Sequence, residues 1–82
     1  SGVKVFPNPS QGKFTVQLTD NTAAGSTITV RNAVGQSIRK IEVNSAVQPI
    51  TEIDLGNEGQ GIYFIQIRNG EKATTRKMVI AN

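Results

Sequence analysis

The sequence lacks cysteine and histidine altogether. Without cysteine there is no disulfide framework and no thiolate chemistry, and the redox compartment of the protein stays undetermined. Without either residue the commonest nucleophile and proton carriers of enzymes are missing, and a zinc ion would lack its usual ligands. A serine with a lysine base, or a pair of carboxylates, remains as the chemistry that an enzyme could still use.

Carboxylates are also few, at six in 82 residues. Only Glu52 and Asp54 are expected to share one face of a strand, and we interpret them as solvent-facing side chains rather than an acid–base pair. The glycine-rich segment 56–61 offers one carboxylate, which is too few for calcium, and its glycines run in the reverse order of a dinucleotide-binding motif. We therefore predict a protein that is not an enzyme and that has no metal and no other cofactor.

Long apolar runs and blocks of charge are missing as well. The apolar run at residues 78–81 is far shorter than the roughly 20 residues of a membrane-spanning helix, and the N-terminus has no hydrophobic stretch of a signal peptide. We expect either a cytosolic domain or a piece of a longer precursor whose export signal lies elsewhere. The net charge of +3 would tolerate an anionic partner. Because the cations alternate with acids and aromatics are scarce, however, we expect no nucleic-acid binding.

Strand patterning dominates the residues that are present. Over residues 13–18 apolar and polar side chains alternate strictly, as in a strand with one buried face. No window has the 3.6-residue period of a helix. The length predicts one domain, residues 1–82, with Ser1 and Gly2 as either native residues or a linker remnant. Strand-like patterns of apolar and polar residues predict seven strands, over residues 3–6, 13–18, 27–31, 37–43, 51–55, 62–68 and 74–80.

Turn signals separate these strands. Asn69-Gly70 favours a tight turn in which both residues have positive φ, which makes the last two strands antiparallel neighbours. Further turns are expected at Asp20-Asn21 and Gln48-Pro49, and Ile38 is out of phase with the rest of its strand, which indicates a β-bulge. We therefore predict an all-β fold, a seven-stranded antiparallel immunoglobulin-like β-sandwich.

Aromatic side chains are too sparse for an obvious sugar-binding platform. Tyr63 and Phe64 are adjacent on a predicted strand and must point to opposite faces. If Tyr63 faces the core, Ile62 and Phe64 face outward. Phe64 is then either covered by a loop or neighbouring side chain, or part of a small apolar patch for a partner.

Four segments occur in an order and spacing that resembles the C-terminal sorting domains of the type IX, or Por, secretion system of Bacteroidota, in their type A form. The segments are VFPNPSQGKFTV (residues 5–16), VRNAVGQSI (30–38), IDL with GIYFIQI (53–55 and 61–67) and RKMVI (76–80). Arg31 departs from the family pattern, which has an aromatic or apolar residue there, and Ala81-Asn82 extend past the usual end. The motif residues, to which we assign mainly structural roles, are Pro7, Asn8, Pro9, Gly12, Gly35, Gln36, Asp54, Leu55, Gly61 and Tyr63.

The resemblance implies a non-catalytic sorting signal with an immunoglobulin-like fold. Such domains follow an N-terminal cargo protein and are read by the outer-membrane translocon of the type IX secretion machinery. The cargo crosses the periplasm and reaches the outer-membrane surface or the medium. Many of these domains are removed by a sortase-like surface protease as the cargo is attached to the cell surface, and here the cut would fall before about residue 3.

The C-terminal strand is the best candidate for recognition. If it lies at a sheet edge, its free N–H and C=O groups could pair with an extended segment of a receptor. We hypothesise that Lys77 and Val79, which share one face, contact the secretion machinery together with the backbone of this strand, and that an open edge also permits self-association. The residues assigned to translocon recognition are Arg76, Lys77, Met78, Val79 and Ile80.

A second interpretation is a stand-alone immunoglobulin-like adhesion or glycan-binding module, whose loops or Phe64 patch would hold a ligand. The two interpretations differ in where the domain lies in its parent protein. A reading frame that continues well beyond Asn82 would exclude the sorting function. A stop codon within a few residues of Asn82, at the end of a long precursor, would favour it.

Overall fold

The computed structural model describes residues 3–18, 25–43 and 50–81. This part of the chain forms seven β-strands and no helix, so it contains no helix that could cross a membrane. Each predicted strand is present, with its ends within two residues of those expected. The strands are β1 (Val3–Phe6), β2 (Lys13–Leu18), β3 (Ser26–Asn32), β4 (Ser37–Val43), β5 (Ile50–Asp54), β6 (Gly61–Asn69) and β7 (Lys72–Ile80). The turns predicted at Asp20-Asn21 and Gln48-Pro49, and the nature of Ser1, Gly2 and Asn82, fall outside the described residues.

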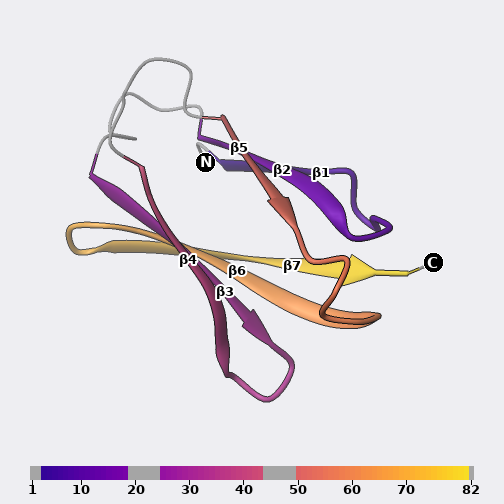
Figure 1. Ribbon diagram of the computed structural model, residues 1–82. Helices are drawn as coiled ribbons and strands as arrows, with labels where there is room; N and C mark the ends of the chain where they lie inside the picture. The colour runs from indigo at the N-terminus through magenta and orange to yellow at the C-terminus, as the bar shows by residue number, and fades with distance from the viewer. Residues whose placement is uncertain (1–2, 19–24, 44–49, 82) are drawn as a thin grey trace.

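The strands form two antiparallel sheets (Figure 1). The smaller sheet has the order β1-β2-β5 and the larger one the order β4-β3-β6-β7, with antiparallel neighbours throughout. β1 ends at Phe6 because the prolines at positions 7 and 9 have no N–H to donate to a ladder. The predicted all-β class is confirmed, and β7 is an edge strand of the larger sheet.

One hydrophobic core joins the two sheets. Alternate residues of β2 and of β6 are buried, as the two-residue period of an extended chain requires. Burial of a valine, leucine, isoleucine, phenylalanine or methionine side chain contributes about 1.5–3 kcal/mol, so this shared core holds the sheets together. The buried apolar residues are Phe14, Val16, Leu18, Ile28, Val30, Val43, Ile53, Leu55, Tyr63, Ile65, Ile67, Met78 and Ile80.

The pairing of β3 with β4 contains the predicted β-bulge. Val30 lies opposite Arg39, whereas the next residue, Arg31, lies opposite Ser37, so Ile38 is the extra residue. Ile38 is half-buried and packs against the core. The bulge thus lets an out-of-phase isoleucine reach the core while the rest of β4 keeps its register.

The turn between β6 and β7 lies one residue later than predicted. Asn69 pairs with Lys72 at the end of the ladder, so the two turn residues are Gly70-Glu71 and not Asn69-Gly70. Gly70 has a φ of +61°, which a tight hairpin turn requires at its first position. The side-chain amide of Asn69 donates instead to the hydroxyl of Ser26, at 3.0 Å, and so holds Asn69 within the strand. The antiparallel pairing of the two strands is as predicted.

Candidate functional site

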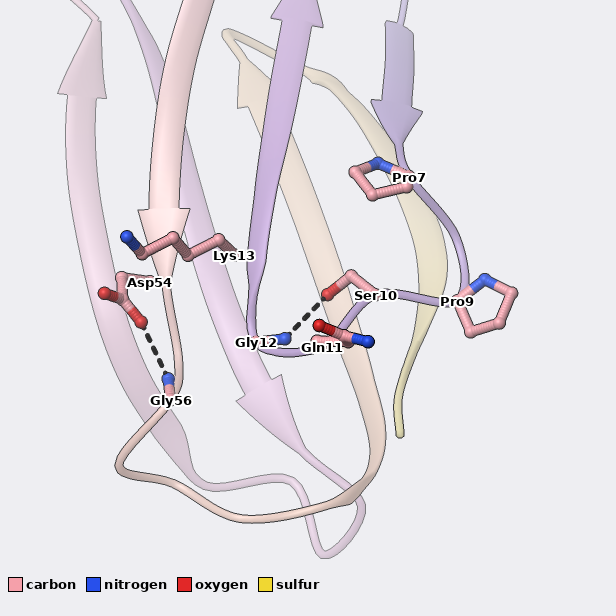
Figure 2. A pocket seen from close by; sticks show the side chains of 8 residues that line it. All are labelled: Pro7, Pro9, Ser10, Gln11, Gly12, Lys13, Asp54 and Gly56. Atoms are coloured by element: carbon pink, nitrogen blue, oxygen red, sulfur yellow. Dashed lines mark hydrogen bonds between the residues drawn. The ribbon is translucent and has the colours of Figure 1, made fainter. Parts of the chain in front are cut away.

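The PNPSQG segment, residues 7–12, and the residues that follow β5 lie together at one end of the smaller sheet. They surround an open hollow of about 640 Å³ (Figure 2). These segments are far apart in the sequence, and they meet because β2 pairs with β5, with Lys13 opposite Asp54. The hollow is lined by Pro7, Pro9, Ser10, Gln11, Gly12, Lys13, Asp54 and Gly56.

Gly12 permits a close approach of two backbone segments in this region. Its φ is +127°, and a Cβ atom at this position would lie 3.1 Å from the Cα of Gly56. The carbonyl of Gly12 accepts a hydrogen bond from the N–H of Leu55, at 2.7 Å, and its own N–H donates to the hydroxyl of Ser10, at 3.1 Å. A side chain at position 12 would therefore force these segments apart.

Asp54 and Leu55 make different contacts. The exposed carboxylate of Asp54 accepts a hydrogen bond from the N–H of Gly56, at 2.8 Å, and so fixes the turn after β5. Leu55 follows the end of β5 rather than lying inside the strand as predicted, but its side chain is fully buried. One residue of this pair thus shapes the turn and the other anchors it in the core.

Asn8 and Ser10 bind along the outer edge of β7, and we call these contacts the edge clasp. The side-chain amide of Asn8 donates to the carbonyl of Lys77, at 2.8 Å, and its Oδ1 accepts from the N–H of Val79, at 3.2 Å. Ser10 bridges to β7 in parallel orientation: its N–H donates to the carbonyl of Val79, at 2.9 Å, and its carbonyl accepts from the N–H of Ala81, at 2.8 Å. The side chain of Asn8 thus acts as a peptide group of a neighbouring strand would.

The edge clasp covers only the C-terminal half of β7. In an antiparallel ladder the N–H and C=O of one residue point to the same side, and successive residues alternate. The backbone N–H and C=O of Val79 point to the clasp, so those of Ala73 and Thr75 also point away from β6. None of the described strands pairs with them there. We expected a receptor to pair with the backbone of residues 76–80, but the edge clasp already binds part of that backbone. The outward backbone groups that are still open lie toward the start of β7.

The residues assigned to translocon recognition fall into two groups. Met78 and Ile80 are buried in the core, so their side chains cannot contact a receptor while the domain is folded. Arg76 shares their face of the sheet, is half-buried, and lies 3.4 Å from the carbonyl of Thr75. Lys77, which is exposed, and Val79, which is half-buried, are the members that face outward from the larger sheet.

Gly35 and Gln36 lie in the turn between β3 and β4, which Asn32 organises. The Oδ1 of Asn32 accepts from the N–H groups of Val34, at 3.1 Å, and Gln36, at 2.9 Å, while its Nδ2 donates to the Oε1 of Gln36, at 2.9 Å. Gly35 has a φ of +90° and donates its N–H to the carbonyl of Asn32, at 3.0 Å. The carbonyl of Gly35 in turn accepts from the guanidinium of Arg31, at 3.3 Å.

Tyr63 ties β6 to the loop that precedes it. Its ring is buried, and the one hydrogen of its hydroxyl is shared between the carbonyl oxygens of Glu58, at 2.8 Å, and Gly59, at 2.7 Å. An ion pair of 3.1 Å between Glu58 and Arg39 connects the same loop to β4. Gly61, with a φ of +147°, starts β6 directly before this anchor. Gly61 and Tyr63 thus shape the end of the loop that leads into β6.

Sequence reasoning missed two polar residues of these turns. Asn32 had a local signal, because an asparagine that follows a strand and precedes a glycine commonly binds its own turn. The bonds of Ser10 to β7 had no local signal, because they join residues that are distant in sequence. Among the described residues, no group of three His, Cys, Asp or Glu side chains could hold a metal ion. The outer edge of β7 is partly open, and such a strand edge can bind an extended segment of another protein.

Comparison with known proteins identifies the family of this chain. The family described as "Secretion system C-terminal sorting domain" matches residues 4–81, nearly the whole chain. The chain belongs to this family. One relative is the "Endo-acting ulvan lyase" of Formosa agariphila, which is 32% identical over 83 residues. The match covers 98% of this chain but only 15% of that protein, so the chain corresponds to a small part of its relative.

The family assignment confirms the resemblance to type IX sorting domains that the sequence motifs carry. Domains of this family form the C-terminal tails of cargo proteins, and the type IX machinery exports those proteins to the cell surface or the medium. The sorting tail is not the catalytic part of such a protein. The function of the chain is therefore that of a secretion signal.

Proposed function

We propose that the type IX translocon recognises this domain at β7, through the side chains of Lys77 and Val79 and the open backbone of Ala73 and Thr75. The observation that carries the proposal is the position of β7 at the edge of the larger sheet, where none of the described strands pairs with the first half of β7 on the side away from β6. An extended receptor segment would add there as a further strand. Backbone hydrogen bonds would supply affinity, and outward side chains would supply specificity.

We infer that the two sheets form an immunoglobulin-like sandwich. With the strands lettered A, B, C, C′, E, F and G in chain order, the sheets are ABE and C′CFG, an arrangement of immunoglobulin-related domains. Tyr63, near the start of the F-equivalent β6, sends its hydroxyl back to the backbone of Glu58 and Gly59. This contact matches the tyrosine corner of such domains and supports the assignment.

For the remaining partners we draw on what the resemblance to type IX sorting domains implies. We propose that the domain follows a cargo protein, has no catalytic activity of its own, and is exported through the periplasm to the outer-membrane surface. A sortase-like surface protease would cut before residue 3. Because β1 starts at Val3, such a cut leaves every described strand intact.

Export of a reporter tests recognition at β7. A reporter with its own Sec signal is fused ahead of the chain and expressed in a bacterium with a type IX system, and the reporter is measured in the medium and on the cell surface. Lys77→Ala combined with Val79→Ala should lower export by about tenfold or more, since a loss of about 1.4 kcal/mol of binding free energy is tenfold in affinity. Removal of residues 76–82 should abolish export, but it also removes core residues and so requires a subtler companion variant.

Thr75→Pro is that companion. It removes an outward N–H that a receptor strand would use, and it leaves the hydrogen bonds between β6 and β7 untouched. Thr75→Ala keeps the N–H and serves as the matched control. We expect both purified variants to melt near the wild-type temperature and only the proline variant to lose export. Wild-type export of both Thr75→Pro and the Lys77/Val79 double variant would contradict recognition at β7.

A further inference from the structure

The outer face of the larger sheet gathers cations that the sequence separates. Strand alternation puts Arg31, Lys40, Arg68 and Lys77 on this face, with Glu42 as its carboxylate among the described residues. Four cations against one carboxylate give a formal charge of +3. The fold thus produces a basic surface that the interleaved charges of the sequence conceal.

Apolar side chains occupy the middle of this surface. Phe64 on β6 lies directly opposite Arg31 on β3 and Lys77 on β7, and the neighbouring pair is Ile62 with Val79. Phe64 is 36% exposed and Ile62 is 44% exposed. Directly opposite residues of an antiparallel pair have Cβ atoms about 4.5–5.5 Å apart, so the phenyl ring has a cation on each side. We call these five residues the basic–apolar face.

A small hollow adjoins this face at the end of the sheet. Its volume is about 220 Å³, and Ala33, Val34, Gly61 and Ile62 form its apolar part. Val34 is 80% exposed. The hollow offers space for one apolar side chain, and side chains seated in this way carry much of the binding energy of protein interfaces. The hydrogen bond from Arg31 to the carbonyl of Gly35 holds the guanidinium against the turn that contributes Ala33 and Val34 to the hollow.

We propose that the basic–apolar face docks an acidic segment of a partner protein. An apolar side chain of that segment seats in the hollow against Ile62, and carboxylates on either side pair with Arg31 and Lys77. The proposal rests on the proposed function, because the partner is a receptor of the secretion machinery. It adds the chemistry of that partner and extends the contact from β7 across β6 to β3.

Charge and shape both favour a protein over a lipid surface. Arginine and aromatic side chains are enriched at the centres of protein interfaces, and a cation beside an apolar anchor gives such an interface its specificity. Membrane-binding surfaces use clusters of about four to eight cations next to protruding apolar side chains. Here Phe64 lies on an inner strand of the sheet and is more than half covered, and the carboxylate of Glu42 stands among the cations.

The test uses residues outside β7, so that it is independent of the export test described above. In the reporter fusion, Arg31→Glu and Phe64→Thr should each lower export by about tenfold or more. Arg31→Lys keeps the charge and should keep most of the export. Lys4→Glu makes the same charge change as Arg31→Glu on the exposed face of the smaller sheet and should have no effect. The three side chains changed in these four variants lie outside the core, and thermal melting of the purified chains should be near that of the wild type.

Three outcomes would overturn the proposal. One outcome is wild-type export of Arg31→Glu and Phe64→Thr together with loss of export in the Lys77/Val79 double variant. It would support recognition at β7 and contradict docking on the basic–apolar face. Failure of the wild-type fusion to be exported by a working type IX system would remove both proposals. Co-sedimentation of the purified chain with vesicles of phosphatidylglycerol, lost in Phe64→Thr, would assign the face to a lipid surface instead.

Discussion

Asn8 illustrates how a single side chain can take the place of a strand. Its amide has both a donor and an acceptor, and it uses them on the carbonyl of Lys77 and the N–H of Val79, groups that a peptide bond of a neighbouring strand would otherwise bind. Pro7 and Pro9 fix the backbone on either side, because their rings hold φ near −65°. The two prolines of Pro7-Asn8-Pro9 therefore restrict the backbone around the asparagine that binds β7.

The stability of an Asn8→Ala variant measures the edge clasp. It loses two hydrogen bonds to backbone, each of which contributes about 0.5–1.5 kcal/mol, and because the site is exposed we expect the free energy of unfolding to fall by about 1–2 kcal/mol. Asn8→Asp keeps the acceptor but loses the donor, and it should be intermediate. Urea unfolding gives the values, with Gln11→Ala in the same loop as the control. If Asn8→Ala unfolds like the wild type, the clasp does not contribute to stability.

At the scale of strands and turns, the sequence predicts what depends on near neighbours. Alternation predicts all seven strands, and a phase error at Ile38 predicts the bulge, because both depend on which face of one strand is buried. The turn at Gly70-Glu71 depends on Asn69 reaching Ser26, 43 positions away, and the clasp depends on Asn8 reaching Val79, 71 positions away. No local pattern encodes such contacts. The same holds for the basic–apolar face, which exists only once β3, β6 and β7 lie side by side.

Tyr63→Phe isolates the anchor of the loop between β5 and β6. The ring stays in the core while the hydrogen bonds to the carbonyls of Glu58 and Gly59 are lost, so we expect a loss of about 1 kcal/mol in the free energy of unfolding. Amide hydrogen exchange should become faster in this loop and stay unchanged in the turn between β3 and β4. Phe64→Tyr, which adds a hydroxyl at an exposed position of the same strand, is the control. Unchanged exchange in the loop of Tyr63→Phe would mean that the hydroxyl does not anchor it.

For the whole molecule, stability depends on one small core shared by two sheets. Domains of this size have a free energy of unfolding of about 5–15 kcal/mol or less, so the loss of one central side chain is a large fraction of the total. β6 is the central strand in this respect, since it pairs with both β3 and β7 and buries Tyr63, Ile65 and Ile67 against the smaller sheet.

Two alanine substitutions on β6 separate core packing from surface chemistry. Ile65→Ala leaves a cavity at a fully buried position and should cost about 2–5 kcal/mol. Ile62→Ala removes the same atoms from a side chain that is 44% exposed and should cost about 1 kcal/mol or less. Calorimetric melting compares them directly. Similar losses in both variants would mean that the sheets are not held together mainly by their shared core.

The edge clasp also determines how the domain would respond to mechanical load. Residues near the two ends of the described chain are joined by four hydrogen bonds, from Asn8 and Ser10 to Lys77, Val79 and Ala81, and Ser10 runs parallel to β7. A force that draws a cargo at the N-terminal end away from a receptor holding β7 slides these segments past each other. The four bonds then bear the load together, in shear, rather than opening one after another. The connection between the cargo and the sorting domain would then resist pulling next to the strand that we propose as the binding site of the secretion machinery.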